Sequence, residues 1–372
     1  MLTPEQIAAL RDAASRVSDP INDFLLKDIA RRISEAGQLT STATYQIYRA
    51  QQMGLYRQQI EKRLQKMLGV SQQEIKKLLT QSAKVGYNFD IKNFSGRAVA
   101  FERNKSIQQM VKAAVELAQD DFTNLVQTLG VVDANGVGQP LRKAYQNTMD
   151  YAFKQVFTGA ADYQTAIRSA ARNIANMGIR VIDYESGVHT SLEAATRRNI
   201  MGGLGLMQEK ISQQNHDDLG ADGWEISAHA GSAPDHEPIQ GKQYTDKEYQ
   251  ALNDSLVRRI GTLNCGHAAF PIILGVNQQQ DTPEQLQKFK DENAKGVSYQ
   301  GVKYTKYEAT QKQREIERAI RLQKNRILMA ENDGNSKLPE YKTRLTLLNQ
   351  EYRRFSNAVG LRTEPERAQI FR

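Results

Sequence analysis

The chain has 372 residues, with 50 Lys and Arg, 42 Asp and Glu and a formal net charge of +8. Its length allows two or three domains, and its longest apolar run, AAFPIILGV, is too short for a membrane-spanning helix. A single cysteine excludes an internal disulfide, and the N-terminus lacks the basic and apolar pattern of a secretory signal, so we expect synthesis and folding in the cytoplasm.

Residues 1–130 are predicted to form a helical N-terminal region. Thr3 and Pro4 indicate a helix start, because the threonine hydroxyl accepts from unpaired backbone N–H groups and proline needs no donor at the first helical position. Ser71 and Glu74 have the spacing of a capping box, which predicts a second helix start at that point.

A further helix and a break are predicted from apolar periodicity. Apolar residues recur at helical spacing over 107–129, and Gly130 is the expected stop. The turn-rich segment VVDANGVGQP at 131–140 is the first candidate domain boundary. Helical periodicity resumes over 141–177, with a break at FTGAADY, and the alternating segment IRVIDY that follows predicts a short strand.

The next stretch changes from helical to mixed character. Thr190 and Glu193 have capping-box spacing and predict a helix that continues despite its glycines. Glycine, proline and short alternating runs dominate residues 224–276, which predicts strands and turns there. We therefore expect a second domain over 140–276 that contains a small α+β module around 180–276.

Residues 300–372 are predicted to form an αα-hairpin after a polar linker, NQQQDTPEQ. One helix is expected from about Tyr304 to Asn332, and NDGNSKLPE turns the chain before the second helix. The apolar residues of that second helix alternate in steps of three and four, as in a heptad seam: Leu338, Tyr341, Leu345, Leu348, Tyr352, Phe355 and Val359. The seam packs either on the preceding helix or on another protein. The predicted fold class is thus mainly α.

The C-terminal hairpin is also basic. From residue 281 onward the chain has 19 Lys and Arg against 13 Asp and Glu. Four cations share one face of the first hairpin helix: Arg314, Arg318, Arg321 and Lys324. Such a ridge can contact DNA phosphates with salt-sensitive affinity. The alternative is a solvated face that only keeps the hairpin soluble, with Glu317 and Arg321 paired along the helix.

The only cysteine and three of the five histidines lie close together in the sequence. Zinc needs about four ligands, and four candidates are present: His229, His236, Cys265 and His267. The first two histidines are spaced more widely than the ligand pairs of common zinc modules. Alternatively, Cys265 is a nucleophile beside a histidine that Asp235 orients. The third interpretation is a core in which the cysteine is a small buried apolar group.

Two segments around these residues resemble the signature of the phage minor capsid protein 2 family, relatives of the Mu F-type head morphogenesis proteins of tailed phages. They read WEISAHAGSAPDHEPIQGKQYT and GTLNCGHAAFPIILGV. The family pattern pairs SxHxGxxPxH…QGK with a later NCxHxxxP and a glycine, and the resemblance covers roughly residues 187–357. The sequence departs from the pattern at Ala233, Ile239 and Gly266, where the family has arginine, tryptophan and a basic residue.

The resemblance implies a structural protein of the virion rather than an enzyme, with residues 140–276 as a head-morphogenesis-like domain. The implied place is the capsid interior at the portal vertex, after assembly in the host cytoplasm. The implied partners are the portal protein, the major capsid protein and packaged double-stranded DNA, without a membrane. No catalytic residue or cofactor is expected, zinc being the one candidate. The alternative is a virion-associated, metal- or cysteine-dependent enzyme on residues 224–276.

Overall fold

The computed structural model describes all residues except 1–3, 94–98, 263–264, 365–367 and 369–372. Most of the described chain is α-helical, which confirms the predicted fold class. The helices are α1 (Pro4–Gly37), α2 (Thr42–Leu55), α3 (Lys62–Asp90), α4 (Lys105–Gln127), α5 (Leu141–Phe157), α6 (Tyr163–Met177), α7 (Leu192–Leu219), α8 (Asp246–Ser255), α9 (Pro283–Lys295), α10 (Lys306–Asp333) and α11 (Leu338–Ala358). None of the helices within the described residues has the length and apolar character that a membrane span requires.

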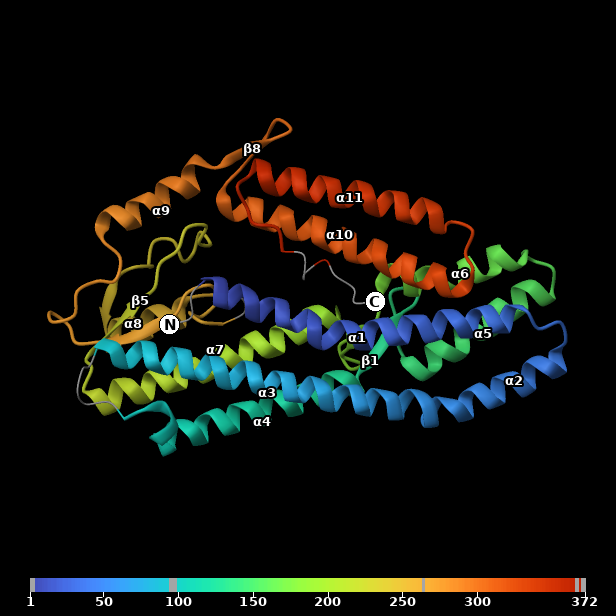
Figure 1. The fold of residues 1–372 in the computed structure, drawn as a ribbon, viewed down its shortest axis with the longest axis horizontal. Helices are drawn as coiled ribbons and strands as arrows, with labels where there is room; N and C mark the ends of the chain where they lie inside the picture. Colours follow the sequence, from blue (N-terminus) through green and yellow to red (C-terminus); the bar gives the residue numbers. More distant parts are fainter. Residues whose placement is uncertain (1–3, 94–98, 263–264, 365–367, 369–372) are drawn as a thin grey trace.

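The long helices lie side by side in an elongated bundle with α1 at its centre (Figure 1). α1 packs against α3, α5, α6, α7 and α10, so most of its circumference is covered. Its buried side chains therefore lie on several faces and join one hydrophobic core: Ala13, Ala14, Val17, Ile21, Leu25, Leu26, Ile29, Ala30 and Ile33. A helix that is apolar on more than one side is typical of the interior of a large bundle.

Two of the expected helix starts are wrong in detail. α3 continues through Ser71 without a break, and the Ser71 hydroxyl donates to the carbonyl oxygen of Val17 at 3.3 Å. α7 is capped by Ser191, whose Oγ accepts from the backbone N–H of Ala194, while Thr190 lies in a strand. Several neighbouring residues can cap the start of a helix, because each can accept from an unpaired backbone N–H group. The packing of the helix therefore decides which residue is the cap.

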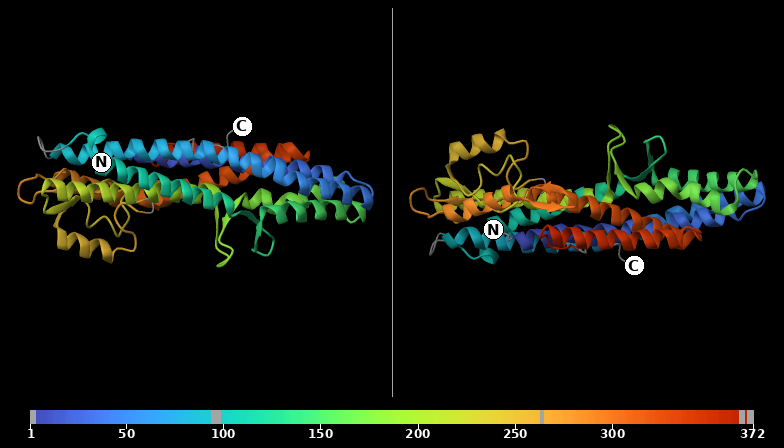
Figure 2. Two further views of the ribbon diagram at one scale, coloured as in Figure 1. Left: turned by 90° about the horizontal axis from the view of Figure 1, so that it is seen from below. Right: turned by 90° about the horizontal axis from the view of Figure 1, so that it is seen from above.

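Two small sheets project from the same face of the helical bundle (Figure 2). The first has the order β2-β1-β3-β4, and the second, in the α+β module, has the order β6-β5-β7. The nine strands of the described chain are β1 (Leu129–Val132), β2 (Gly138–Pro140), β3 (Arg180–Ile182), β4 (His189–Ser191), β5 (Gly223–Ile226), β6 (Gln243–Thr245), β7 (Ala269–Ile272), β8 (Val297–Tyr299) and β9 (Val302–Tyr304).

The first sheet confirms one prediction and corrects another. The strand predicted from IRVIDY is β3, which pairs antiparallel with β1 and with β4. Gly130, the expected helix stop, lies inside β1, because α4 ends at Gln127 and the chain is extended from Leu129. The turn-rich segment after β1 becomes the hairpin to β2, where the side chain of Asp133 accepts from the backbone N–H groups of Asn135 and Val137.

α10 and α11 form the predicted αα-hairpin, and the seam of α11 packs on α10. Tyr352, Phe355 and Val359 share a hydrophobic cluster with apolar residues of α10, among them Ile316 and Ile320. Gly334, with φ of +70°, ends α10 in the left-handed conformation that glycine adopts at low cost. The preceding helix is therefore the partner of the heptad seam.

The hairpin is also built into the main bundle. α10 packs along α1 and α6, and Leu328 and Met329 belong to the same core as the interior of α1. α9 begins within the polar linker expected before the hairpin, and its N-terminus carries a capping box between Thr282 and Gln285. Apolar side chains of α10 itself therefore join the hairpin to the bundle. The domain limits 1–130, 140–276 and 300–372 stay a prediction.

Candidate functional site

The α+β module brings two loops together at one end of its sheet. β5 is the central strand, and its last residue, Ile226, is paired with the first residue of β7, Ala269. The loop that leaves β5 carries His236, and the loop that enters β7 carries Cys265 and His267. Because these loops adjoin the same end of neighbouring strands, residues about thirty positions apart in the sequence come into contact.

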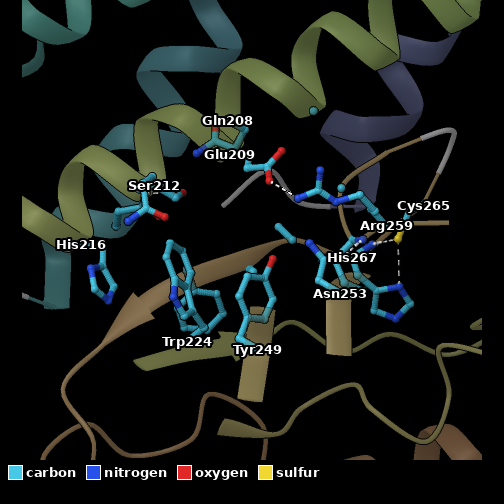
Figure 3. A pocket seen from close by; sticks show the side chains of 18 of the residues that line it. Gln208, Glu209, Ser212, His216, Trp224, Tyr249, Asn253, Arg259, Cys265 and His267 are labelled. Carbon is cyan, nitrogen blue, oxygen red and sulfur yellow. Dashed lines mark hydrogen bonds and ion pairs between the residues drawn. The ribbon is translucent and has the colours of Figure 1, made fainter. Parts of the chain in front are cut away.

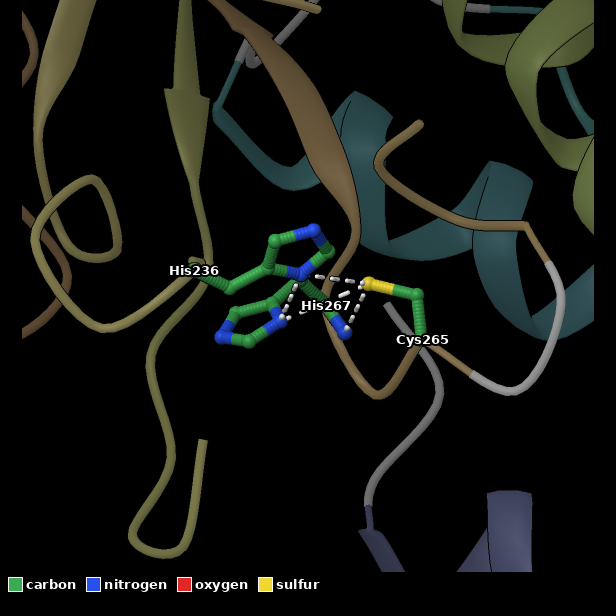
Figure 4. A group of neighbouring side chains, drawn as sticks. All are labelled: His236, Cys265 and His267. Atoms are coloured by element: carbon green, nitrogen blue, oxygen red, sulfur yellow. Dashed lines mark hydrogen bonds between the residues drawn. The ribbon is translucent and has the colours of Figure 1, made fainter. Parts of the chain in front are cut away.

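His236, Cys265 and His267 form a compact triangle, named the His–Cys triangle below (Figure 4). The Sγ atom of Cys265 lies 3.3 Å from Nδ1 of His236 and 3.4 Å from Nδ1 of His267. The two Nδ1 atoms are 3.4 Å apart. His236 is 2% exposed and His267 is 4% exposed, so the centre is shielded from bulk water. Three of the four candidate ligands predicted from the sequence therefore meet.

Each histidine of the triangle is held through its outer ring nitrogen. Nε2 of His236 lies 2.9 Å from the carbonyl oxygen of Arg258, which only accepts, so Nε2 carries the proton. Nε2 of His267 lies 2.9 Å from Oε1 of Gln240, and that oxygen also accepts from the backbone N–H of His229 at 3.0 Å. Nε2 of His267 is therefore a donor as well. In their neutral forms, both rings direct the lone pair of Nδ1 toward the centre of the triangle.

The surroundings shift the protonation of all three groups. Burial lowers the pKa of His267 to about 2, with the neighbouring histidines adding to the effect, so this ring is neutral near pH 7. Burial raises the pKa of the Cys265 thiol, but its interaction with His236 and hydrogen bonds from backbone N–H groups outweigh this effect and leave the pKa lowered overall. The hydrogen bond with Cys265 in turn raises the pKa of His236. A sulfur with a lowered pKa is suited to metal binding or to nucleophilic attack.

His229, the fourth candidate ligand, lies beside the His–Cys triangle and is not one of its corners. Its ring stacks on that of His267 with centroids 4.3 Å apart, and its Nδ1 lies 3.1 Å from the carbonyl oxygen of Ala230. A Cβ atom on Gly266 would lie 2.6 Å from Nε2 of His229. Glycine at 266, a position where the sequence departs from the family pattern, thus makes room for this ring.

Asp235 does not orient His236 in the way the nucleophile hypothesis expects. Its Oδ1 pairs with the guanidinium of Arg258 at 3.2 Å, and its Oδ2 lies 3.8 Å from Nε2 of His236. The closer partner of that nitrogen is the Arg258 carbonyl. Asn264, a residue of the second family motif, lies outside the described residues.

A cavity of about 340 Å³ adjoins the triangle between the module and α7 (Figure 3). Cys265 and His267 line one part of it, and a stack of three rings lines another. In this stack Trp224 lies between His216 and Tyr249, with ring centroids 5.0 and 5.2 Å apart. Sequence reasoning missed the stack because its members come from α7, β5 and α8, and no local spacing relates them.

The four cations of α10 do not form one exposed ridge. Arg321 turns toward α1 and pairs through both guanidinium Nη atoms with the carboxylate of Asp19, which is 0% exposed. Lys324 donates to the carbonyl oxygen of Ala368, and Arg314 is half-buried in a cleft that Asp19 also lines. Arg318 is exposed. The expectation that all four face outward is wrong, because their side of α10 lies partly against α1, while DNA contact itself stays a prediction.

Glu317 and Arg321, which were expected to pair along α10, each contact another helix. Glu317 is buried and accepts a hydrogen bond from the phenol of Tyr352 at 2.8 Å, which links α10 to α11. Arg321 pairs with Asp19 of α1. The two residues therefore connect α10 to two different helices.

Comparison with known proteins identifies one family. The family model described as phage minor capsid protein 2 matches residues 2–357. No curated protein and no solved structure gives a significant match. The match begins far upstream of the two motifs, so it includes the helical N-terminal region as well as the α+β module.

Proposed function

The chain belongs to the phage minor capsid protein 2 family, and on this premise we propose that it is a structural component of the phage head at the portal vertex, inside the capsid. The observation that carries the proposal is the length of the match, residues 2–357, which spans the bundle, the α+β module and most of the C-terminal hairpin. The family supports a structural role rather than an enzymatic one. Its role in the head would be to assist head morphogenesis and the packaging or ejection of DNA.

The shape of the fold supports a docking function. The bundle is elongated, and both sheets stand out from the same face of it (Figures 1 and 2). A long helical surface suits contact with the portal protein and with the major capsid protein. The α+β module at one end would add a rigid and chemically distinct contact, because it is anchored on α7 through β7.

The location in the head is tested on purified phage particles. We expect quantitative mass spectrometry to find the chain in mature virions at far fewer copies than the major capsid protein, and chemical cross-linking to join it to the portal protein. Absence from mature particles would exclude a virion component and leave only a transient assembly role. Cross-links to the major capsid protein without any to the portal would contradict the portal location.

Contact with packaged DNA is proposed for the exposed cations of the hairpin. Excess positive charge favours a polyanion partner, and Arg318, Arg344 and Arg353 are exposed on α10 and α11. Each lost phosphate contact should reduce the slope of log affinity against log salt by about 0.9 on duplex DNA. Changing all three to glutamine in the full-length chain should therefore lower the slope by up to about 3.

A matched control removes the same charge from another part of the molecule. Lys76, Lys77 and Lys154 are exposed on α3 and α5, and their replacement by glutamine lowers the net charge equally. We expect this control to change the slope less than the hairpin variant does. Equal slopes for the two variants would show that the hairpin has no particular DNA-facing role, since only net charge would then matter.

A further inference from the structure

We infer that the His–Cys triangle binds a zinc ion. The proposed structural role does not by itself require such a metal site. Tetrahedral zinc with Zn–N distances of about 2.0–2.1 Å and a Zn–S distance of about 2.3 Å places neighbouring ligand atoms about 3.3–3.6 Å apart. The three edges of the triangle measure 3.3, 3.4 and 3.4 Å. Nδ1 of His236, Sγ of Cys265 and Nδ1 of His267 therefore already have the separations of three zinc ligands.

The proton positions point to a cation at the centre. The carbonyl oxygen of Arg258 and Oε1 of Gln240 fix the ring protons of His236 and His267 on Nε2, away from the triangle. Two Nδ1 lone pairs then face each other across 3.4 Å. The single proton of the Cys265 thiol can satisfy only one of them. A metal ion accepts both lone pairs and the thiolate at once, and outer partners of this kind are typical of metal-bound histidines.

The ligand set favours zinc over other ions and over a catalytic dyad. Calcium and magnesium prefer oxygen ligands, whereas two imidazoles and a thiolate suit zinc. A cysteine nucleophile would need only one imidazole within reach of its sulfur. It gives no reason for the second imidazole, that of His267, to lie equally close to both Cys265 and His236.

Bound zinc would join the two loops of the module. Three ligands come from the chain, and the adjoining cavity, which Cys265 and His267 line, can supply a water molecule as the fourth. His236 lies between β5 and β6, and the other two ligands lie before β7, so the ion would fasten together two loops that the sheet holds only at their strand ends. The module would then keep its shape without a large hydrophobic core of its own.

The test uses the full-length protein purified without chelators. We expect about one zinc ion per chain by elemental analysis. After exchange of zinc for cobalt, we expect visible absorption of tetrahedral Co²⁺ together with a thiolate charge-transfer band. Cys265→Ser and His236→Gln should each lose both signals. His216→Gln is the matched control, because His216 is a buried histidine of the same cavity that is not in the triangle, and it should keep both.

A graded variant and a test on the unmodified chain complete the experiment. Gln240→Leu removes the partner of Nε2 of His267 and should weaken zinc binding by roughly 10–100-fold. Zinc should also protect Cys265 of the unmodified protein from alkylation, which needs no variant to fold. A folded protein with only trace zinc and no cobalt spectrum would overturn the inference. Alkylation of Cys265 at the same rate in the protein as purified and after a chelator has removed its zinc would also overturn it.

Discussion

Replacing Arg321 by methionine should destabilise the protein by about 3–5 kcal/mol at pH 8, because it leaves a buried charge without its partner. Asp19 is fully buried in α1, and the guanidinium of Arg321 from α10 pairs with both of its carboxylate oxygens. Methionine fills a similar volume but has no charge. Among the described residues, the hydroxyl of Ser18 at 3.4 Å would still donate to the carboxylate, but a contact of this length is too weak to offset the loss.

The effect of this substitution should depend on pH. Burial raises the pKa of Asp19 from 3.8 to about 6, and Arg321 acts in the opposite direction. Between pH 3.8 and about 6, Asp19 therefore keeps its proton in the folded state but has lost it in the unfolded state. The contribution of Asp19 to stability falls as the pH rises through this range. Without Arg321 the pKa should rise further. Denaturant unfolding should accordingly show a smaller loss from Arg321→Met at pH 5 than at pH 8.

Two variants separate the ion pair from general effects of charge. Arg318 is exposed and one turn away, so Arg318→Met should change the free energy of unfolding by no more than about 0.5 kcal/mol. Asp19→Asn combined with Arg321→Met should recover part of the lost stability, because position 19 then no longer carries a buried charge. Equal losses from Arg318→Met and Arg321→Met would show that the pair with Asp19 is not a structural contact in solution.

Deletion of residues 304–372 should abolish cooperative unfolding of the remainder. The deletion removes Leu328 and Met329 from the main core, where loss of a large apolar side chain costs about 2–5 kcal/mol. It also leaves Asp19 without Arg321, at a further cost of about 3–5 kcal/mol. Together these losses are comparable with the whole stability of a typical domain, about 5–15 kcal/mol. Thermal unfolding followed by circular dichroism measures the outcome.

A shorter deletion is the matched control. Removing residues 336–372 takes away α11 but keeps Arg321, Leu328 and Met329 in place on α10. We expect this protein to unfold cooperatively at a lower temperature than the full chain, because the apolar face of α10 loses its cover. If residues 1–303 alone unfolded cooperatively at the temperature of the full chain, α10 would not be part of the bundle core.

The sequence by itself determined the fold class, most helices and the residue types of the site. Apolar periodicity located α4, α5, α6, α10 and α11, because a helix buries one face at a fixed angular repeat. The motifs around His236 and Cys265 indicated the family that the match over residues 2–357 then showed. Residue chemistry also narrowed the candidate metal ligands to four, since few histidines and one cysteine are present.

Only the tertiary structure decided which of these side chains meet and which face inward. Periodicity places Arg318 and Arg321 on the same side of α10, but it contains no information on the neighbouring helix that covers Arg321 and leaves Arg318 exposed. The His–Cys triangle depends on the pairing of Ile226 with Ala269, which sets where two loops from distant parts of the chain touch. Local patterns report how a segment repeats along its own axis, whereas contacts between segments depend on the register and packing of the whole chain.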